Sequence, residues 1–222
     1  MSKQFHNFDA GDLSLDYANT LDWHASENPI EQLNSYDDFV AWGVQAQLIS
    51  EQSGRHLRQK ALKQPEKYAA FLKQAITVRE SIYSIFSRRY SGKPLPENDL
   101  QVLNSVVQQA MSHLQLVPID GKIKLDWMPD VNASDRILWS VARAAAELLT
   151  SDKAKRVREC EDDRGCGYLF IDQTKNHSRR WCSMDSCGNR AKAHRHYTRV
   201  KKPQASSSFP PLEYPETPQP TV

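Results

Sequence analysis

Four cysteines near the C-terminal end are the residues whose type and spacing are best suited to chemistry. They follow the pattern Cys160-x5-Cys166-x15-Cys182-x4-Cys187. Zn²⁺ takes four thiolates in a tetrahedron at Zn–S distances of about 2.3 Å, and two close cysteine pairs can supply them. The x4 spacing is usual for such a pair, whereas the x5 spacing is one residue longer. The pattern therefore predicts one zinc ion bound by all four cysteines.

Two other states of these cysteines compete with zinc: two buried disulfides, or four unrelated thiols. The chain begins without the apolar stretch of a secretory signal and has no run of about 18 apolar residues that could span a membrane. We therefore expect a reducing cytoplasm, where structural disulfides are uncommon. A closed shell of four thiolates leaves no position for a catalytic water, so we expect the zinc to be structural.

The positive charge of the chain is concentrated around the cysteines. Residues 151–202 hold 14 Lys and Arg against 7 acidic residues, a net charge of +7, while residues 1–150 carry −3 and residues 203–222 carry −2. This asymmetry favours an anionic partner, most often nucleic acid, although a solvated cationic face is the simpler explanation of charge alone. We expect DNA rather than RNA.

A helix expected from Gly188 to about Lys201 would present much of this charge. At about 100° per residue, its basic side chains share one side with His196. Ala193, Tyr197 and Val200 fall on the adjacent side, where they can pack back on the hairpin. Asn189 and Arg190 could read base edges or could brace the helix. The expected nucleic-acid contacts are Arg179, Arg180, Asn189, Arg190, Lys192, Arg195, Arg199 and Lys202.

The first 150 residues are expected to be helical. Apolar residues recur at helical spacing in several segments, two of them with a candidate capping serine, Ser35 or Ser134. Asp120-Gly121 predicts a two-residue turn between strands at 114–119 and 122–127. Helical segments are expected around residues 13–21, 35–49, 71–85, 100–110 and 134–148.

The predicted fold class is mainly α (α+β), with three parts along the chain. Residues 1–150 form a helical domain with one hairpin, and residues 151–202 form a treble-clef-like zinc finger, with a zinc ribbon as the alternative. We expect the two to have separate cores. Strands of the finger are expected at 157–160, 168–172 and 180–182, with Trp181 packed beneath the zinc. Residues 203–222 are rich in Pro and Ser and are expected to be disordered.

Asp16 and Asn19 are polar residues inside the apolar stripe of the first helical segment. They could line a pocket for a small-molecule effector, joined by Trp23 or His24. The simpler alternative is that they satisfy backbone groups at helix ends. The histidines form no HxxxH or HExxH pair, and no Ser-His-Asp set or glycine-rich phosphate loop stands out. We therefore expect that the protein is not an enzyme.

The segment ending in Cys187-Gly188-Asn189-Arg190 resembles the CGNR zinc finger, as do residues 166–172 and 176–180. The segment Leu13-Ser14-Leu15-Asp16-Tyr17-Ala18-Asn19-Thr20-Leu21 resembles the ABATE domain, which normally precedes that finger. The resemblance covers roughly residues 5–201. It implies a bacterial, stress-linked transcription regulator whose four cysteines bind zinc. The x5 spacing between Cys160 and Cys166 departs from the family's pattern.

Two classes of function follow from these observations. In the first, the protein is a DNA-binding regulator, in which the helical domain senses an effector or forms a homodimer and the finger contacts DNA. In the second, it is a protein-interaction or RNA-binding module, in which the finger is only a scaffold.

Overall fold

The computed structural model describes residues 3–6, 8–129 and 132–201, except for the side chains of residues 198–201. The predicted mainly helical fold with a small zinc finger is confirmed. The helices are α1 (Leu13–Ala18), α2 (Tyr36–Gln45), α3 (Glu51–Lys63), α4 (Pro65–Tyr90), α5 (Glu97–Ser112), α6 (Ala133–Thr150) and α7 (Asn189–Lys201). Antiparallel strand pairs are β1 (Leu21–Asp22) with β2 (Ile30–Glu31), β3 (Leu114–Ile119) with β4 (Lys122–Trp127), and β5 (Val157–Glu159) with β6 (Leu169–Ile171).

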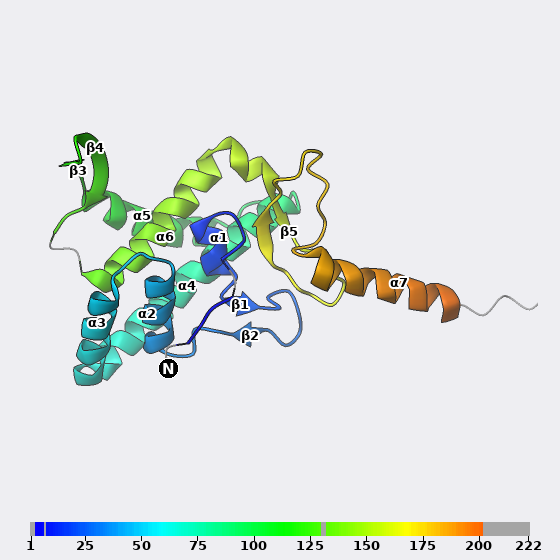
Figure 1. Ribbon diagram of the computed structural model, residues 1–222, viewed down its shortest axis with the longest axis horizontal. Helices are drawn as coiled ribbons and strands as arrows, with labels where there is room; N and C mark the ends of the chain where they lie inside the picture. Colours follow the sequence, from blue (N-terminus) through cyan, green and yellow to red (C-terminus); the bar gives the residue numbers. More distant parts are fainter. Residues whose placement is uncertain (1–2, 7, 130–131, 202–222) are drawn as a thin grey trace, which may run out of the picture.

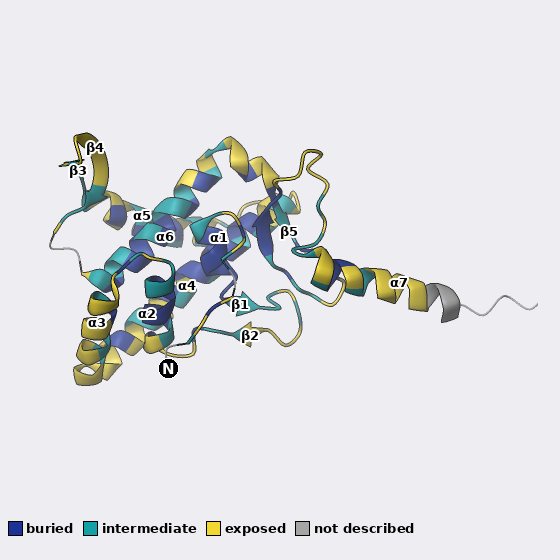
Figure 2. Ribbon diagram, in the orientation of Figure 1, coloured by how far each residue is buried: buried dark blue, intermediate teal, exposed yellow. Residues whose placement is uncertain are grey.

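The short helix α1 lies at the centre of the helical body, between α4 and α6 (Figure 1). Five of its six residues are buried, and Figure 2 shows it as a continuous dark patch. Tyr17 packs on Phe39 and Trp42 of α2, and its hydroxyl donates to the backbone oxygen of Ala75 in α4 at 2.9 Å. Among the helices that the structure describes, none combines the length and apolar composition needed to cross a membrane.

Local sequence explains most helix starts. Ser35 caps α2 as predicted, in a reciprocal capping box with Asp38. The cap predicted at Ser134 is wrong: the N-cap of α6 is Asn132, two residues earlier, and the Ser134 hydroxyl lies 2.6 Å from that of Tyr36. Helix α3 has no expected counterpart, because its polar sequence buries only Gly54 and Leu57.

The hairpin β3–β4 has the predicted register, with Ile119 opposite Lys122. Asp120 and Gly121 both have positive φ, 50° and 72°, as the two-residue turn that matches strand twist requires. The hairpin projects from the body beyond α5 and α6 (Figure 1). Its base packs through Trp127, whose ring centroid lies 5.9 Å from that of Trp139 in α6.

The expectation of separate cores is wrong. Val157, Leu169 and Ile171 of the β5–β6 hairpin belong to the same buried cluster as the helices. Phe170, between the last two, belongs instead to the cluster around the cysteines. Because successive side chains of a strand point to opposite faces, β6 forms part of both cores at once.

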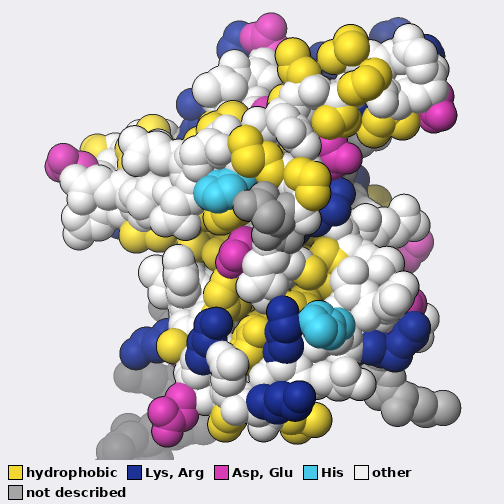
Figure 3. Space-filling model, turned by 90° about the vertical axis from the view of Figure 1, so that its left-hand side faces the viewer, with side chains coloured by type: hydrophobic (Ala, Val, Ile, Leu, Met, Phe, Trp, Pro, Cys, Tyr) yellow, Lys and Arg dark blue, Asp and Glu magenta, His cyan; other side chains and the backbone are white. Residues whose placement is uncertain are grey.

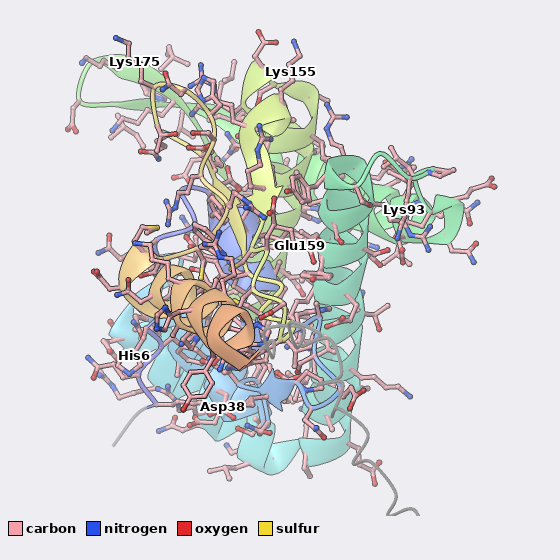
Figure 4. The ribbon with its side chains drawn as sticks, turned by 90° about the vertical axis from the view of Figure 1, so that its right-hand side faces the viewer. His6, Asp38, Lys93, Lys155, Glu159 and Lys175 are labelled. Carbon is pink, nitrogen blue, oxygen red and sulfur yellow. The ribbon has the colours of Figure 1, made fainter. Side chains whose placement is uncertain are left out.

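Polar contacts reinforce this shared core. The Asn19 amide donates to the Leu169 oxygen at 2.8 Å and accepts from the Leu169 N–H at 2.9 Å, in place of a neighbouring strand. Glu159 accepts hydrogen bonds from the hydroxyls of Tyr83 (3.0 Å) and Ser87 (2.6 Å) in α4, beside which Figure 4 shows it. The domain boundary near residue 150 stays a prediction.

Replacing Asn19 with Ala should lower the free energy of unfolding by about 3 kcal/mol, because it leaves two buried backbone groups of Leu169 without partners. Urea unfolding of the zinc-loaded protein measures this. Asn34→Ala is the matched control, since Asn34 is exposed and donates to the backbone oxygen of nearby Glu31. Equal losses in the two variants would contradict the role assigned to Asn19.

Candidate metal centre

The four cysteines come from two separate segments. Cys160 follows β5 and Cys166 precedes β6, so the first pair lies in the turn of that hairpin. Cys182 ends a loop, and Cys187 lies in the π-helical turn η2 (Met184–Gly188), which continues directly into α7. A helix follows the second cysteine pair directly, as in the expected treble-clef arrangement. Residues 180–182 are described by the structure and do not form the expected strand.

The four sulfur atoms lie within 4.8 Å of one another. The distance between Cys166 Sγ and Cys182 Sγ is 3.8 Å, and between Cys182 Sγ and Cys187 Sγ it is 3.5 Å. A zinc–thiolate tetrahedron with bonds of about 2.3 Å has edges of about 3.8 Å. The donor atoms therefore fit one zinc ion, and the cysteines are free thiols rather than disulfides.

The surroundings favour a thiolate at Cys160, whereas the pKa values of the other three thiols are raised. The Cys182 N–H donates to Cys160 Sγ at 3.4 Å, and the Arg190 guanidinium donates to Cys187 Sγ at 2.9 Å. Hydrogen bonds from Cys166 and Cys182 lower the pKa of Cys160, and the same contacts with Cys160 raise the pKa of those two thiols. Since one negative charge opposes the next, binding by all four thiolates requires the cation.

The first knuckle, one residue longer than usual, is held by hydrogen bonds to Asp162 and by two glycines in its turn. Asp162 is buried, and its carboxylate accepts hydrogen bonds from the backbone and side chain of Arg164 and from Arg190. Burial acts to raise the pKa of Asp162, but the bonds from Arg164 outweigh it and lower the pKa to about 2. Gly165 and Gly167 have φ of +85° and +65°, and a Cβ on either would lie within 2.7 Å of the Ala25–Ser26 backbone. The x5 spacing is therefore compatible with a complete knuckle.

Sequence reasoning did not anticipate the role of Trp23. It has a positive φ of 54°, and the guanidiniums of Arg164 and Arg190 each lie 5.2 Å from the centroid of its ring. Trp23 follows β1, so the helical part of the chain contributes one wall of the metal centre. Neither the charge pattern nor the cysteine spacing contains a signal for these contacts, which join Trp23 to residues 141 and 167 positions away.

The structure separates the expected nucleic-acid residues into two groups. Arg179 and Arg190 are turned inward. Arg179 donates to the backbone oxygens of Trp181 and Cys182 and lies 4.5 Å from the Phe170 ring, and Arg190 contacts Cys187 and Asp162. These contacts favour bracing, one of the two roles left open for Arg190.

The second group is exposed: Arg180, Asn189, Lys192 and Arg195. Arg180 pairs with Glu161 at 2.5 Å. The guanidiniums of Arg180 and Arg195 lie 5.3 and 5.6 Å from the centroid of the Trp181 ring, so the loop and α7 bring two cations to one indole. Trp181 packs on the cysteine cluster, as expected, and is half-buried.

Helix α7 leaves exposed the two described side chains that the sequence predicts to pack on the hairpin. Ala193 is exposed, and so is Tyr197, with 64% of its surface accessible. Beyond its second turn the helix projects from the body (Figure 1), with exposed residues along its length (Figure 2). The side chains of Arg199 and Val200 are not described, and Lys202 and the expected disordered tail at 203–222 lie outside the described residues.

Asp16 and Asn19 are both buried and bond to the backbone. Asp16 accepts from the Ala10 N–H at 3.0 Å, and burial raises its pKa to about 6. His24 bonds to Glu80 at 2.9 Å and stacks on Tyr83. These contacts match the simpler alternative of backbone satisfaction, and an effector site at Asp16 and Asn19 stays a prediction.

Comparison with protein families gives two matches that together span most of the chain. A family model named ABATE, with the description "Putative stress-induced transcription regulator", matches residues 11–152. A second model, the CGNR zinc finger, matches residues 156–200. Neither description names an enzyme. Comparison with curated proteins gives no match. The cysteine cluster lies entirely within the second match, and the four cysteines fit one structural zinc ion.

Metal analysis should find one zinc per chain, and Cys182→Ser should reduce this stoichiometry severely, because Cys182 Sγ lies near two of the other sulfurs. Since β6 is shared, the variant should also lower the main thermal transition instead of melting the finger alone. Ser183→Ala is the neighbouring control and should keep its zinc. A wild-type finger that is folded without metal would contradict the prediction.

Arg190→Ala should weaken zinc binding by roughly 10- to 100-fold, because Arg190 bonds to a ligand sulfur and to buried Asp162. Competition with a chromogenic chelator measures this. Lys192→Ala, two residues further along α7 and exposed, should leave zinc affinity unchanged. If both variants lose zinc alike, Arg190 has no special role in the metal centre.

Proposed function

The chain belongs to the ABATE family and carries a C-terminal CGNR zinc finger, and on this premise we propose that it is a zinc-dependent, DNA-binding transcription regulator. The finger contacts DNA, and the helical part senses a small-molecule effector or pairs with a second copy. The protein acts in the bacterial cytoplasm. It has no catalytic role.

The observation that carries the proposal is the way α7 is held. Its first two turns are fixed to the knuckle on one side, by Arg190 to Asp162 at 3.3 Å and by His194 to Asp163 at 2.7 Å. At about 100° per residue, Lys192 lies about 160–200° from these two residues. The zinc centre thus anchors one side of the helix and turns the basic side outward.

A rigid helix with an exposed basic side suits a phosphate backbone. Phosphate contacts position a protein on a duplex. Side chains near the N-terminal end of a helix in the major groove reach base edges. Asn189 is exposed in the first turn of α7 and is the residue that we assign to base contact. Arg180 and Arg195, gathered at Trp181, extend the basic side beyond the helix itself.

If about five phosphates are contacted, the logarithm of the association constant should fall with the logarithm of salt concentration with a slope of about −4 to −5. Replacing Lys192 and Arg195 with Ala should reduce the magnitude of the slope by about 2 and weaken binding to all sequences alike. Fluorescence anisotropy with random duplex DNA and with the protein's own promoter measures both effects.

The matched control removes two cations elsewhere, with Lys60→Ala and Lys63→Ala in the last turn of α3. This pair should keep the wild-type slope. A wild-type slope near zero would overturn DNA binding. A steep slope for single-stranded RNA with weak duplex binding would favour the RNA-binding alternative, and salt-insensitive association would favour a protein-interaction module.

A further inference from the structure

The projecting hairpin β3–β4 has one face made only of apolar side chains. Cross-strand partners alternate between the two faces of a two-stranded sheet. On the first face the pairs are Leu114 with Trp127, Leu116 with Leu125, and Pro118 with Ile123. On the second face lie both lysines and the aspartate of β4, opposite Gln115, Val117 and Ile119. The first face, termed here the apolar hairpin face, carries no charge and no polar side chain apart from the indole N–H of Trp127.

The apolar hairpin face is exposed. Leu116 is 71% accessible, Ile123 68% and Leu125 46%, and Met111 at the end of α5 adds another 49% accessible side chain. Figure 3 shows the hairpin as an arm at the upper right with hydrophobic side chains gathered along it. An isolated two-stranded hairpin is marginal in water and needs a covered apolar face to be stable. The base of this hairpin packs on α6 through Trp127 and Trp139.

We propose that a second copy of this chain covers the apolar hairpin face, in a two-fold symmetric dimer with the two hairpin faces packed together. The remaining large exposed apolar side chains of the described residues are scattered over β2, α3, the 91–96 segment, η2 and α7. Among the described residues, the large exposed apolar side chains are therefore concentrated on this hairpin, and the hollow lined mainly by apolar side chains of α2, α3 and α4 holds only one of them, Leu62. In a two-fold contact the same patch serves both partners, so one patch is sufficient.

The size of the patch fits this partner. Each of the four exposed side chains presents on the order of 100 Å² of apolar surface, and Pro118 and the sheet ends bring the total to about 500 Å² per copy. Two copies then bury about 1,000 Å², the least that a specific interface is expected to bury. A face without charge has no means of selecting a charged partner, whereas it is complementary to itself.

This inference rests on the proposed function in one respect: the dimer would present two DNA-binding fingers related by two-fold symmetry. The hairpin and α7 project from different ends of the body (Figure 1). A dimer joined at the hairpins leaves both fingers accessible, and paired fingers suit a DNA site with two related half-sites.

Sedimentation velocity of the full zinc-loaded chain between about 1 and 100 µM tests the proposal. The wild type should be a dimer at the higher concentrations. The double variant Leu116→Glu, Ile123→Glu should be a monomer throughout, because pairing would bury four carboxylates against apolar surface. Lys124→Glu changes charge on the opposite face of the same strand and should remain a dimer. Circular dichroism and zinc content should match the wild type in both.

Hydrogen exchange of the wild type provides a second measurement that needs no variant. On dilution from dimer to monomer, the amides of residues 114–127 should lose protection while those of α4 keep theirs. A monomeric wild type at 100 µM, a dimeric double variant, or a dimer whose dissociation leaves residues 114–127 unchanged would each overturn the proposal. A monomer that binds DNA leaves the proposed function intact, and a dimer with no salt-dependent DNA binding leaves the dimer intact.

Discussion

The double burial of β6 is the constraint on which the rest of the structure depends. Three residues serve two cores, with Leu169 and Ile171 in the helical core and Phe170 against the cysteines. A three-residue strand with one partner strand leaves backbone groups to satisfy, and these are met by the Asn19 amide and by the Ala10 oxygen, 2.8 Å from the Ile171 N–H. The zinc centre therefore packs directly on the helical body, and the two are not joined by a linker alone.

A buried ionic network strengthens the same junction from the other side. Arg79 of α4 is only 2% exposed and binds both carboxylate oxygens of Glu31 in β2, at 2.6 and 2.7 Å. Burial acts to raise the pKa of Glu31, but the hydrogen bonds and charge of Arg79 outweigh it and lower the pKa. A buried guanidinium is tolerated only with such partners, so β2 and the loop that carries Trp23 are held firmly against α4. Trp23 then lies where Arg164 and Arg190 enclose it.

These attachments divide the molecule into a fixed centre and two projecting elements. The centre comprises α1, α4, α6 and the β5–β6 hairpin, whose inner residues are buried (Figure 2). The projecting elements are α7, rooted at the metal centre, and the β3–β4 hairpin, rooted at Trp139. A change at the zinc ligands reaches the helices through the β5–β6 hairpin. Phe170 packs on the cysteines while its neighbours Leu169 and Ile171 lie in the helical core, and Glu159, directly before Cys160, bonds to α4. Coupling between finger and body thus has a physical path of packed residues and hydrogen bonds.

The sequence by itself determined the features that depend on neighbouring residues: the capping box at Ser35, the Asp120-Gly121 turn, the helical periodicity and the pairing of cysteines into one zinc site. These are local because turn geometry, helix capping and ligand spacing act over a few residues. Only the tertiary structure decided that Asn19 pairs with Leu169, that Trp23 borders the metal centre, that Arg179 and Arg190 point inward and that Tyr197 stays exposed. Each of these depends on which residues, far away in the chain, pack beside the residue in the folded protein. A periodic pattern shows which side of an element is apolar or charged, but not what that side meets, because partners far apart in the chain leave no mark on local spacing.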